Sequence, residues 1–372
     1  MYIPNIEYIL KNMRKLSFPR VASSESEKLA FAYVEEEAKP LGLIIEYQKF
    51  DDDWIVPFVS NFVYKSNSYP LVSSMVYKYM ELSMPWGFSD SLDTDIVGII
   101  SNNKDTKAIR AYESIKPELF DDPNAIAIIG FDETNRSQIA CTQLSKYKYL
   151  PCFFINPRQN IQLQENELLS IQVRTHKTVR EFTNMIIRKT NGNSIAPVII
   201  GAHIDTFPGS PGASDDAFGV GMCLDIVRQC GLDDNIWIVL FTGEEIDRRG
   251  SRTYIERYIN AGHIKPRLYI NIDSGVEAGS GDIHIKIHPE ELSHDISAVF
   301  NEEYAIENEI FQSDDSVPFS DNGTPVFWVW AKSPQRAHSI HDTVDNVDVE
   351  QLNNIAKLYS KAINQYIGLS AM

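Results

Sequence analysis

Acidic and histidine side chains follow three hydrophobic segments that are expected to be strands. The segments "PVIIGAH", "NIWIVLF" and "RLYINID" lie at 197–203, 235–241 and 267–273. The side chains that end or follow them are His203, Asp205, Glu244, Glu245 and Asp273. Because sites in open α/β sheets form beyond the carboxyl ends of the strands, we expect these side chains to meet at one edge of a sheet.

Two further segments supply candidate ligands. The loop "TFPGSPGASDD" carries Asp215 and Asp216 to the start of the next predicted helix, and "AHSIHDTVDN" contains His338 and His341. An aspartate at the start of a helix is usually a cap, so each of these acids taken alone would be uninformative. Either histidine would complete a set of ligands, and spacing alone does not choose between them.

Histidine nitrogens and carboxylate oxygens together form a donor set that suits zinc. One carboxylate can bridge two divalent ions roughly 3.5 to 4 Å apart, and such a pair polarises a carbonyl and activates water for hydrolysis. The expected ligands are His203, Asp215, Glu245, Asp273 and one of the two histidines of the later segment. Asp205 is expected to orient His203, and Glu244, beside a ligand, is expected to take a proton from the attacking water.

The alternation of predicted strands and helices places these residues in an α/β fold. From residue 197 onward it predicts a mixed, mostly parallel sheet with helices on both faces. The helices of this part are expected at 215–229, 251–261, 289–304 and 348–366. Earlier in the chain, Ser24 and Glu27 form a capping box that predicts a helix, and a strand is expected at 43–50. Short apolar segments within 67–172 predict a smaller domain inserted into the first.

The composition restricts the partners of the chain. Its 372 residues hold 34 Lys and Arg against 51 Asp and Glu, a formal net charge of −17 that would repel nucleic acid and anionic membranes. The sequence has no run of about 18 apolar residues and no signal peptide pattern, so we expect a cytoplasmic protein without a membrane span. The four cysteines show no CxxC spacing and are too few for a disulfide framework.

Six motifs in a fixed order carry a resemblance to a known family. The segments "GAHIDT", "PGASDDAFG", "TGEEIDRRGS", "NID", "SDDSVPF" and "AHSIHDTVDNVD" resemble the successive motifs of the two-zinc aminopeptidases. The wider group of that family includes glutamate carboxypeptidases, glutaminyl cyclases and the transferrin receptor. The resemblance covers about 173–367 and the N-terminal helix and strand. It implies a metallopeptidase domain at 1–66 and 173–372, and an insertion at 67–172 similar to the protease-associated domain.

The resemblance also implies a role for each site residue. His203 and Asp273 would hold one zinc ion, Glu245 and a C-terminal histidine the other, and Asp215 would bridge them, with Glu244 as general base. The family pattern H-[ST]-x-x-D-[ST] is met by "HSIHDT" when it starts at His338, which makes His338 the last ligand. His341 would then be a neighbour of the site, and Asp216 would not be a ligand.

The expected function is hydrolysis of a peptide bond at a chain end, most simply by a metallo-aminopeptidase with two bridged zinc ions. A carboxypeptidase or dipeptidase, or a deacylase of N-acyl substrates, would use the same metal pair, and a glutaminyl-cyclase-like acyltransferase is a weaker alternative. Arg248 and Arg249 would favour a carboxypeptidase if they bound a substrate carboxylate, although a solvated charge pair is the simpler interpretation. A non-catalytic binding protein is disfavoured because every ligand position and the base are filled. A homo-oligomer stays open.

Overall fold

The structure is a computed structural model that divides into two compact units. It describes residues 1–65, 67–70, 76–80, 84–88, 94–112, 122–131, 140–144, 149–155, 162–189, 196–207, 209–230, 235–273, 275–291, 300, 304–308, 314–331 and 337–369. The first unit is Met1–Phe50 with Glu181–Met372, and the second is Asp51–Arg180. β1 (Ile44–Tyr64) and β10 (Leu168–Arg188) each run from one unit into the other. The units are therefore divided within continuous strands, whereas the sequence pattern placed the boundaries after residues 66 and 172.

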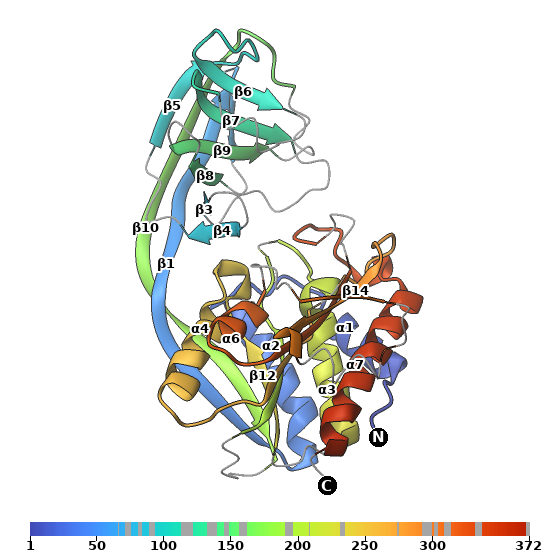
Figure 1. Ribbon diagram of the computed structural model, residues 1–372. Helices are drawn as coiled ribbons and strands as arrows, with labels where there is room; N and C mark the ends of the chain where they lie inside the picture. Colours follow the sequence, from blue (N-terminus) through green and yellow to red (C-terminus); the bar gives the residue numbers. More distant parts are fainter. Residues whose placement is uncertain are drawn as a thin grey trace. The chain divides into compact units, whose positions relative to one another are not determined.

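The first unit contains the mixed, mostly parallel sheet expected from the sequence (Figure 1). The strand order is β15-β14-β16-β13-β11-β12-β10-β1. The strands not yet introduced are β11 (Val198–His203), β12 (Ile236–Phe241), β13 (Leu268–Asn271), β14 (Ile283–His288), β15 (Ala305–Glu307) and β16 (Val326–Ala331). β11 is parallel to β12 and β13, β13 is parallel to β16, and β14 is parallel to β15, whereas β10 is antiparallel to β12 and β14 is antiparallel to β16. The α/β fold class is confirmed.

Helices cover both faces of this sheet, as the burial of alternate strand residues shows. Ile200 of β11 and Ile238 of β12 belong to a hydrophobic core that also takes in side chains of four helices. These helices are α1 (Ile6–Leu16), α2 (Glu25–Ala38), α3 (Phe218–Cys230) and α7 (Val349–Leu369). Ile199 and Val239 belong to a second core on the opposite face, with side chains of α4 (Arg249–Tyr254) and α6 (Ser316–Asp321). Strands buried on both faces read as continuous apolar runs, which is why the sequence revealed them.

The helices follow the sequence-based expectations with three differences. Ser24 caps α2 by accepting from the backbone N–H of Glu27 at 3.2 Å, but the Glu27 carboxylate accepts from the backbone N–H of Ser23 rather than Ser24. The helix expected to begin at residue 215 instead begins at Phe218, after a turn at Ala213–Ala217. The helix expected at 251–261 corresponds to α4 and a wider turn at Ile255–Asn260. The helix expected at 289–304 lies largely outside the described residues.

The second unit has a six-stranded sheet of its own, in the order β4-β3-β8-β9-β7-β6. The strands are β3 (Val76–Met80), β4 (Met84–Phe88), β6 (Ala108–Tyr112), β7 (Ala125–Phe131), β8 (Ala140–Leu144) and β9 (Tyr149–Ile155). In addition, β2 (Asn67–Pro70) pairs with β1, and β5 (Thr94–Ile99) pairs with β10. A separate hydrophobic core includes Ile109, Ile129 and Ile171. Each unit therefore has a hydrophobic core of its own.

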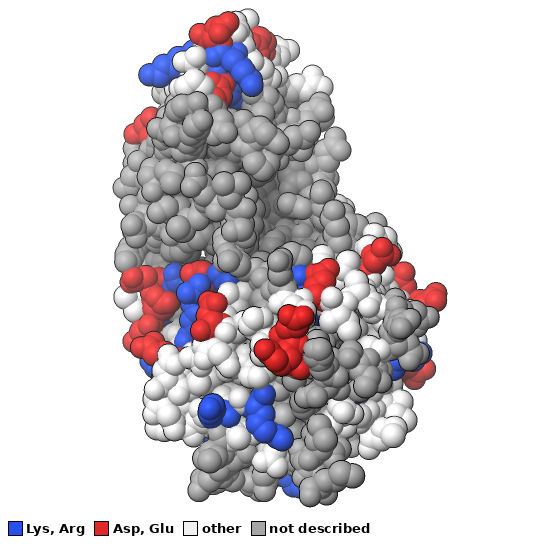
Figure 2. Space-filling model, viewed as in Figure 1, with Lys and Arg blue, Asp and Glu red and all other residues white. Residues whose placement is uncertain are grey.

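Charged side chains are mixed on the visible surface. On the face drawn in Figure 2, small groups of Asp and Glu alternate with small groups of Lys and Arg. Among the described residues, no helix is both long enough and apolar enough to cross a membrane.

Candidate metal centre

The central parallel strands bring three predicted ligands to one edge of the sheet. His203 is the last residue of β11, and its register partner on β12 is Phe241. Glu245 follows β12 in a short 3-10 turn, Glu244–Ile246, and Asp273 comes two residues after the end of β13. Because the strands are parallel and in register, their carboxyl ends deliver these side chains to the same place.

Asp215 lies between the two histidines that were expected to bind metal. Its Oδ1 is 2.9 Å from Nε2 of His203, and its Oδ2 is 3.0 Å from Nε2 of His338. The buried Asp342 holds the backbone before Asp215, because its carboxylate accepts from the N–H groups of Ser214 at 2.7 Å and Asp215 at 3.2 Å. A single carboxylate thus presents one oxygen to each of two histidines from distant segments.

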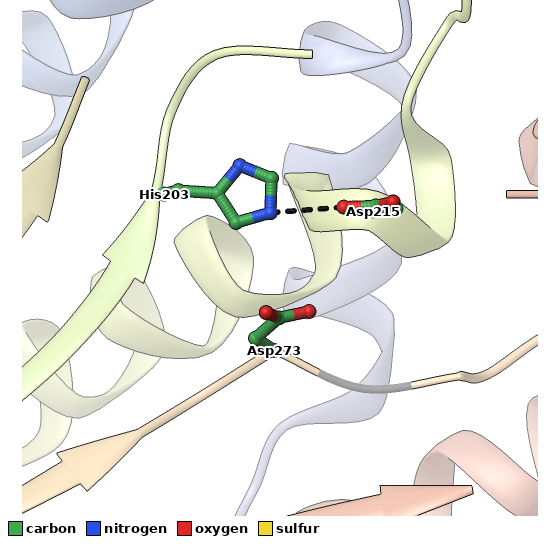
Figure 3. Close-up of side chains that lie close together, drawn as sticks. All are labelled: His203, Asp215 and Asp273. Atoms are coloured by element: carbon green, nitrogen blue, oxygen red, sulfur yellow. Dashed lines mark ion pairs between the residues drawn. The ribbon is translucent and has the colours of Figure 1, made fainter. Parts of the chain in front are cut away.

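Two sets of donor atoms share this carboxylate. Atoms of His203, Asp215 and Asp273 lie within 4.8 Å of one another, and so do atoms of Asp215, Glu245 and His338. Figure 3 shows the first set, with His203, Asp215 and Asp273 directed toward a common space from three different segments. In the second set, Nε2 of His338 is 3.1 Å from Oε2 of Glu245. The sequence-predicted ligands therefore come together as two neighbouring groups of three with one member in common.

The surroundings of Nε2 of His203 suit a metal ion better than a hydrogen bond to Asp215. Its Nε2 is buried and, among the described residues, has no hydrogen-bond partner, although Asp215 Oδ1 is only 2.9 Å away. The contact does not have hydrogen-bond geometry. A buried nitrogen left without a hydrogen bond is costly unless another partner takes its lone pair. The nitrogen and oxygen donors of both sets are those that zinc prefers.

The backbone carbonyl of Asp205 determines which nitrogen of His203 is available. Nδ1 of His203 is 3.1 Å from this carbonyl oxygen, which can only accept, so Nδ1 carries a hydrogen and Nε2 is the nitrogen that could bind a metal. The carboxylate of Asp205 is farther away, with Oδ1 3.7 Å from Nδ1. It instead accepts from the N–H groups of Glu244 at 3.2 Å and Glu245 at 3.4 Å. The fully buried Asp205 therefore contacts both the histidine and the glutamate pair.

The two adjacent glutamates have different surroundings. Oε1 of Glu245 accepts from the N–H of Phe207 at 2.8 Å, which leaves Oε2 directed to His338. Burial raises the pKa of Glu244 well above its ordinary value; His203 opposes this rise, and Glu245, Asp315 and Asp273 add to it. A carboxylate with a raised pKa is suited to accept a proton near neutral pH.

The carboxylates of the site raise the pKa of both histidines. Burial lowers the pKa of His203, but the carboxylates of Asp205 and Asp215 outweigh it and hold that pKa well above the usual value. Burial likewise lowers the pKa of His338, and Glu245 and Asp215 raise it by more. Without a metal, carboxylates draw protons onto both rings, and a bound cation would take the place of those protons.

His338 and His341 lie in different environments. His338 has a left-handed φ of 61° and stacks on Phe207, with 4.6 Å between ring centroids and 13° between planes. His341 is exposed and belongs to neither set of donor atoms. Of these two histidines, His338 is the one that lies with the other predicted ligands.

Three other residues singled out in the sequence also have defined positions. Asp216 is fully buried and accepts from the N–H groups of Gly219 at 2.8 Å and His203 at 3.3 Å, so it supports the backbone. The interpretation of Arg248 as a solvated residue was wrong, because it is only 4% exposed and contacts Asp247 at 2.8 Å. Arg249 lies over the ring of Phe182.

Two residues near the site were missed by sequence reasoning. Arg20 is buried and contacts the backbone between His203 and Asp215. Asp342 holds the turn that carries Asp215. A signal existed for Asp342, which occupies the Asp position of the "HSIHDT" pattern, but none is visible for Arg20.

Known proteins resemble this chain in sequence and in fold. Residues 184–363 match the family described as Peptidase family M28. Over 95 residues the chain is 32% identical to the probable lipoprotein aminopeptidase LpqL of Mycobacterium tuberculosis, a match that covers 24% of this chain and 19% of that protein.

Two solved structures share the fold. The aminopeptidase from Aneurinibacillus sp. strain AM-1 has a TM-score of 0.64 at 19% identity, covering 97% of this chain and 93% of that one. BSAP, a zinc aminopeptidase from Bacillus subtilis, has a TM-score of 0.72 at 16% identity, covering 98% of this chain and 96% of that one. At this low identity the likeness shows the α/β fold of the whole chain.

Proposed function

We propose that the chain, which matches peptidase family M28 over residues 184–363, is an aminopeptidase that holds two zinc ions. The observation that supports the proposal most strongly is the position of Asp215. Its two carboxylate oxygens lie 2.9 and 3.0 Å from Nε2 atoms of His203 and His338. A carboxylate that faces two separate ligand sets is the arrangement needed for a bridged metal pair.

The proposed ligands divide between the two ions as the donor sets do. His203 and Asp273 would hold one ion, Glu245 and His338 the other, and Asp215 would bridge both. When bound, two zinc ions polarise the carbonyl of the scissile bond and lower the pKa of water. His203 would hold its ion through Nε2, because the carbonyl oxygen of Asp205 contacts Nδ1.

Glu244 is proposed to move the proton in this reaction. Its carboxylate, whose pKa is raised by burial, takes a proton from the attacking water and returns it to the nitrogen of the leaving amine. Asp205 holds Glu244 in place by accepting from its backbone N–H. Water gives its oxygen to the acyl carbon, the peptide C–N bond breaks, and the products are an acid and an amine.

A substitution of Glu244 tests this proposal. We expect Glu244→Gln to keep its zinc, because Glu244 is not a ligand, and to lose turnover by roughly 10²- to 10⁴-fold. Zinc content and hydrolysis of a peptide with a free N-terminus are measured on the same preparations, with the exposed Glu256→Gln as the matched control. Near-normal turnover by Glu244→Gln would show that another group is the base.

The substrate class is tested by blocking one end of the peptide at a time. An aminopeptidase cleaves a free-amine peptide and its C-amidated form, but not the N-acetylated form. A carboxypeptidase would reject the C-amidated form, and a deacylase would prefer the N-acetylated one. Either of these results would contradict the aminopeptidase proposal while leaving the metal centre intact.

Several expectations go no further than the sequence. We propose that the inserted domain expected at 67–172 corresponds to the second compact unit, residues 51–180, and its similarity to the protease-associated domain stays a prediction. A peptide substrate is implied by the peptidase family. The cytoplasmic location and the homo-oligomer also stay predictions.

A further inference from the structure

Arg20 is a buried cation that lies outside the part of the chain matched by the peptidase family. It belongs to the segment between α1 and α2, and the family match begins only at residue 184. Its side chain is fully buried, which is rare for an arginine. Such burial is costly unless the guanidinium is fully hydrogen-bonded, so the positions of its partners indicate what the residue does.

The guanidinium of Arg20 holds both ends of the loop that connects two proposed ligands. Nε donates to the carbonyl oxygen of Ile204 at 2.8 Å, Nη1 donates to Pro211 at 3.0 Å, and Nη2 donates to Gly212 at 3.3 Å. The backbone of Arg20 adds two bonds, because its N–H donates to Thr206 Oγ1 at 2.9 Å and its carbonyl oxygen accepts from the N–H of Thr206 at 3.2 Å. One residue therefore spans the start, the middle and the end of the loop.

The carbonyl groups that Arg20 binds are next to the metal-binding side chains. Ile204 lies between His203 and Asp205, and Gly212 immediately precedes the turn Ala213–Ala217 that carries Asp215. Gly212 has a left-handed φ of 61°, and an added Cβ would lie 2.6 Å from the carbonyl oxygen of Asp215. The loop is tightly folded here, so its two ends cannot shift independently once Arg20 holds them.

The remaining bonds of Arg20 anchor the loop to the first helix. Nη1 also donates to the carbonyl oxygens of Leu16, at the end of α1, and of Phe18 at 3.2 Å. Among the described residues, no carboxylate lies within 4.0 Å of the guanidinium, so its direct contacts are with carbonyl oxygens. A planar guanidinium with five N–H groups can make this pattern when Nη1 shares one of its two hydrogens between two carbonyl oxygens, whereas the ammonium of lysine has three donors and no fixed plane.

The charge of Arg20 also acts on the site. Burial lowers its pKa to about 10, against the opposing effect of the carboxylates of Asp216, Asp342, Asp205 and Asp215. The residue is therefore a cation at neutral pH.

We propose that Arg20 is a positioning residue of the metal centre, which clamps the loop at 204–212 so that His203 and Asp215 present their donor atoms to one ion. The inference rests on the proposed function, because it assumes that these residues bind zinc. Arg20 belongs to the segment before α2, so the proposed site includes a residue that lies outside the part of the chain matched by the family.

Zinc affinity separates a positioning role from a merely structural one. Arg20→Lys keeps the charge and loses the fork of donors, and Arg20→Met loses both; the exposed Arg14→Lys and Arg14→Met are the matched controls. Zinc affinity is measured by competition with a chelator, together with the thermal stability of the metal-free protein, kcat and KM. We expect both Arg20 variants to bind zinc roughly 10- to 100-fold more weakly, as for other residues that orient ligands. We expect kcat to fall while KM changes little, and both controls to match the wild type.

The outcomes distinguish this inference from the proposed function. If Arg20→Lys lowers thermal stability but binds zinc as tightly as the wild type, the role is structural only and the inference is overturned. Should Arg20→Met not fold, Arg20→Lys decides the question alone. A wild-type protein that binds no zinc would instead refute the proposed function, and the positioning role with it.

Discussion

Asp215 connects the two halves of the candidate site, and its neighbours show why the site could largely be predicted. His203, Glu245 and Asp273 follow consecutive parallel strands, so the order of strands in the sequence was enough to place them together. Asp215 required more, because an aspartate near a helix start has a common role as a cap. In the structure its carboxylate contacts His203 and His338 instead of capping a helix.

The choice between His338 and His341 gives a prediction at the scale of single residues. His338 lies 3.0 Å from Asp215 and 3.1 Å from Glu245, whereas His341 is exposed and belongs to neither donor set. We expect His338→Ala to lose one of the two proposed zinc ions and His341→Ala to keep both. Zinc content after dialysis measures the difference, and each variant serves as the control for the other. Loss of zinc only in His341→Ala would reverse the assignment.

The raised pKa values of the histidines predict how zinc binding depends on pH. Carboxylates raise the pKa of His203 and of His338, which favours the protonated form of both rings in the metal-free protein. Zinc requires neutral imidazoles, so binding must release protons, and the affinity must rise as the pH is raised toward these pKa values. Calorimetric titration with zinc at pH 7, in two buffers with different heats of ionisation, measures the release. Equal apparent enthalpies in both buffers would mean that no protons are released and that the rings are already neutral.

Contacts between side chains and backbone groups are the part of the site that could not be predicted from the sequence. Arg20 binds carbonyl oxygens of Ile204, Pro211 and Gly212, and any residue type offers such an oxygen. No spacing of residue types in the sequence predicts a contact between a side chain and a backbone carbonyl oxygen. Asp342 likewise accepts from backbone N–H groups, and only its place in a family pattern marked it.

At the scale of elements, burial explains which strands and helices could be predicted. β11, β12 and β13 are buried at every position, and such runs stand out in a sequence. The start of the helix after Asp215 was misplaced because acidic residues there suggested a cap, whereas Asp215 and Asp216 have φ values of −124° and −136°. This non-helical backbone directs Asp215 toward the histidines. The local preference of Asp215 and Asp216 for the start of a helix is therefore overridden by the contacts that Asp215 makes with the histidines.

The long strands β1 and β10 show a different limit. Each contains 21 residues and crosses from one compact unit to the other. The sequence predicted only the first part of β1, at 43–50, because the following residues do not alternate between apolar and polar types in a regular way. Domain boundaries are usually sought in polar linkers, and a boundary within a continuous strand gives no such signal.

At the scale of the whole molecule, each unit depends on its own interior for stability. The core of the second unit includes Ile109, Ile129 and Ile171, and the buried ion pair of Arg110 and Asp122 belongs to the same unit. Nε of Arg110 is 2.6 Å from Oδ2 of Asp122, and both side chains are almost completely buried. Arg110 also donates to the carbonyl oxygens of Ser101 at 2.6 Å and Thr106 at 2.7 Å. The pair therefore connects β6 to the segments on either side of it.

Removing one partner of this pair should destabilise the second unit. Asp122→Asn leaves the charge of Arg110 buried without a carboxylate, and breaking a buried pair costs about 3 to 5 kcal/mol. Burial raises the pKa of Asp122, but the Arg110 guanidinium and the backbone N–H groups of Asn124 and Ala125 lower it by more. Because the folded pKa lies below the unfolded value, the stabilisation is present above the unfolded pKa of about 3.9 and is lost as the pH falls through the folded pKa. The penalty of Asp122→Asn should therefore be full at pH 7 and shrink in acid.

Urea unfolding at pH 7 and at a series of lower pH values measures this penalty, with Glu167→Gln as the matched control. Glu167 forms an exposed pair with Lys65 in the same unit at 3.9 Å, so its substitution should cost less than about 1 kcal/mol. Equal losses of stability in Asp122→Asn and Glu167→Gln would show that the buried pair adds nothing beyond an exposed one. A penalty that grows as the pH falls would contradict the lowered pKa of Asp122, because protonation in the wild type removes the same interaction that the substitution removes.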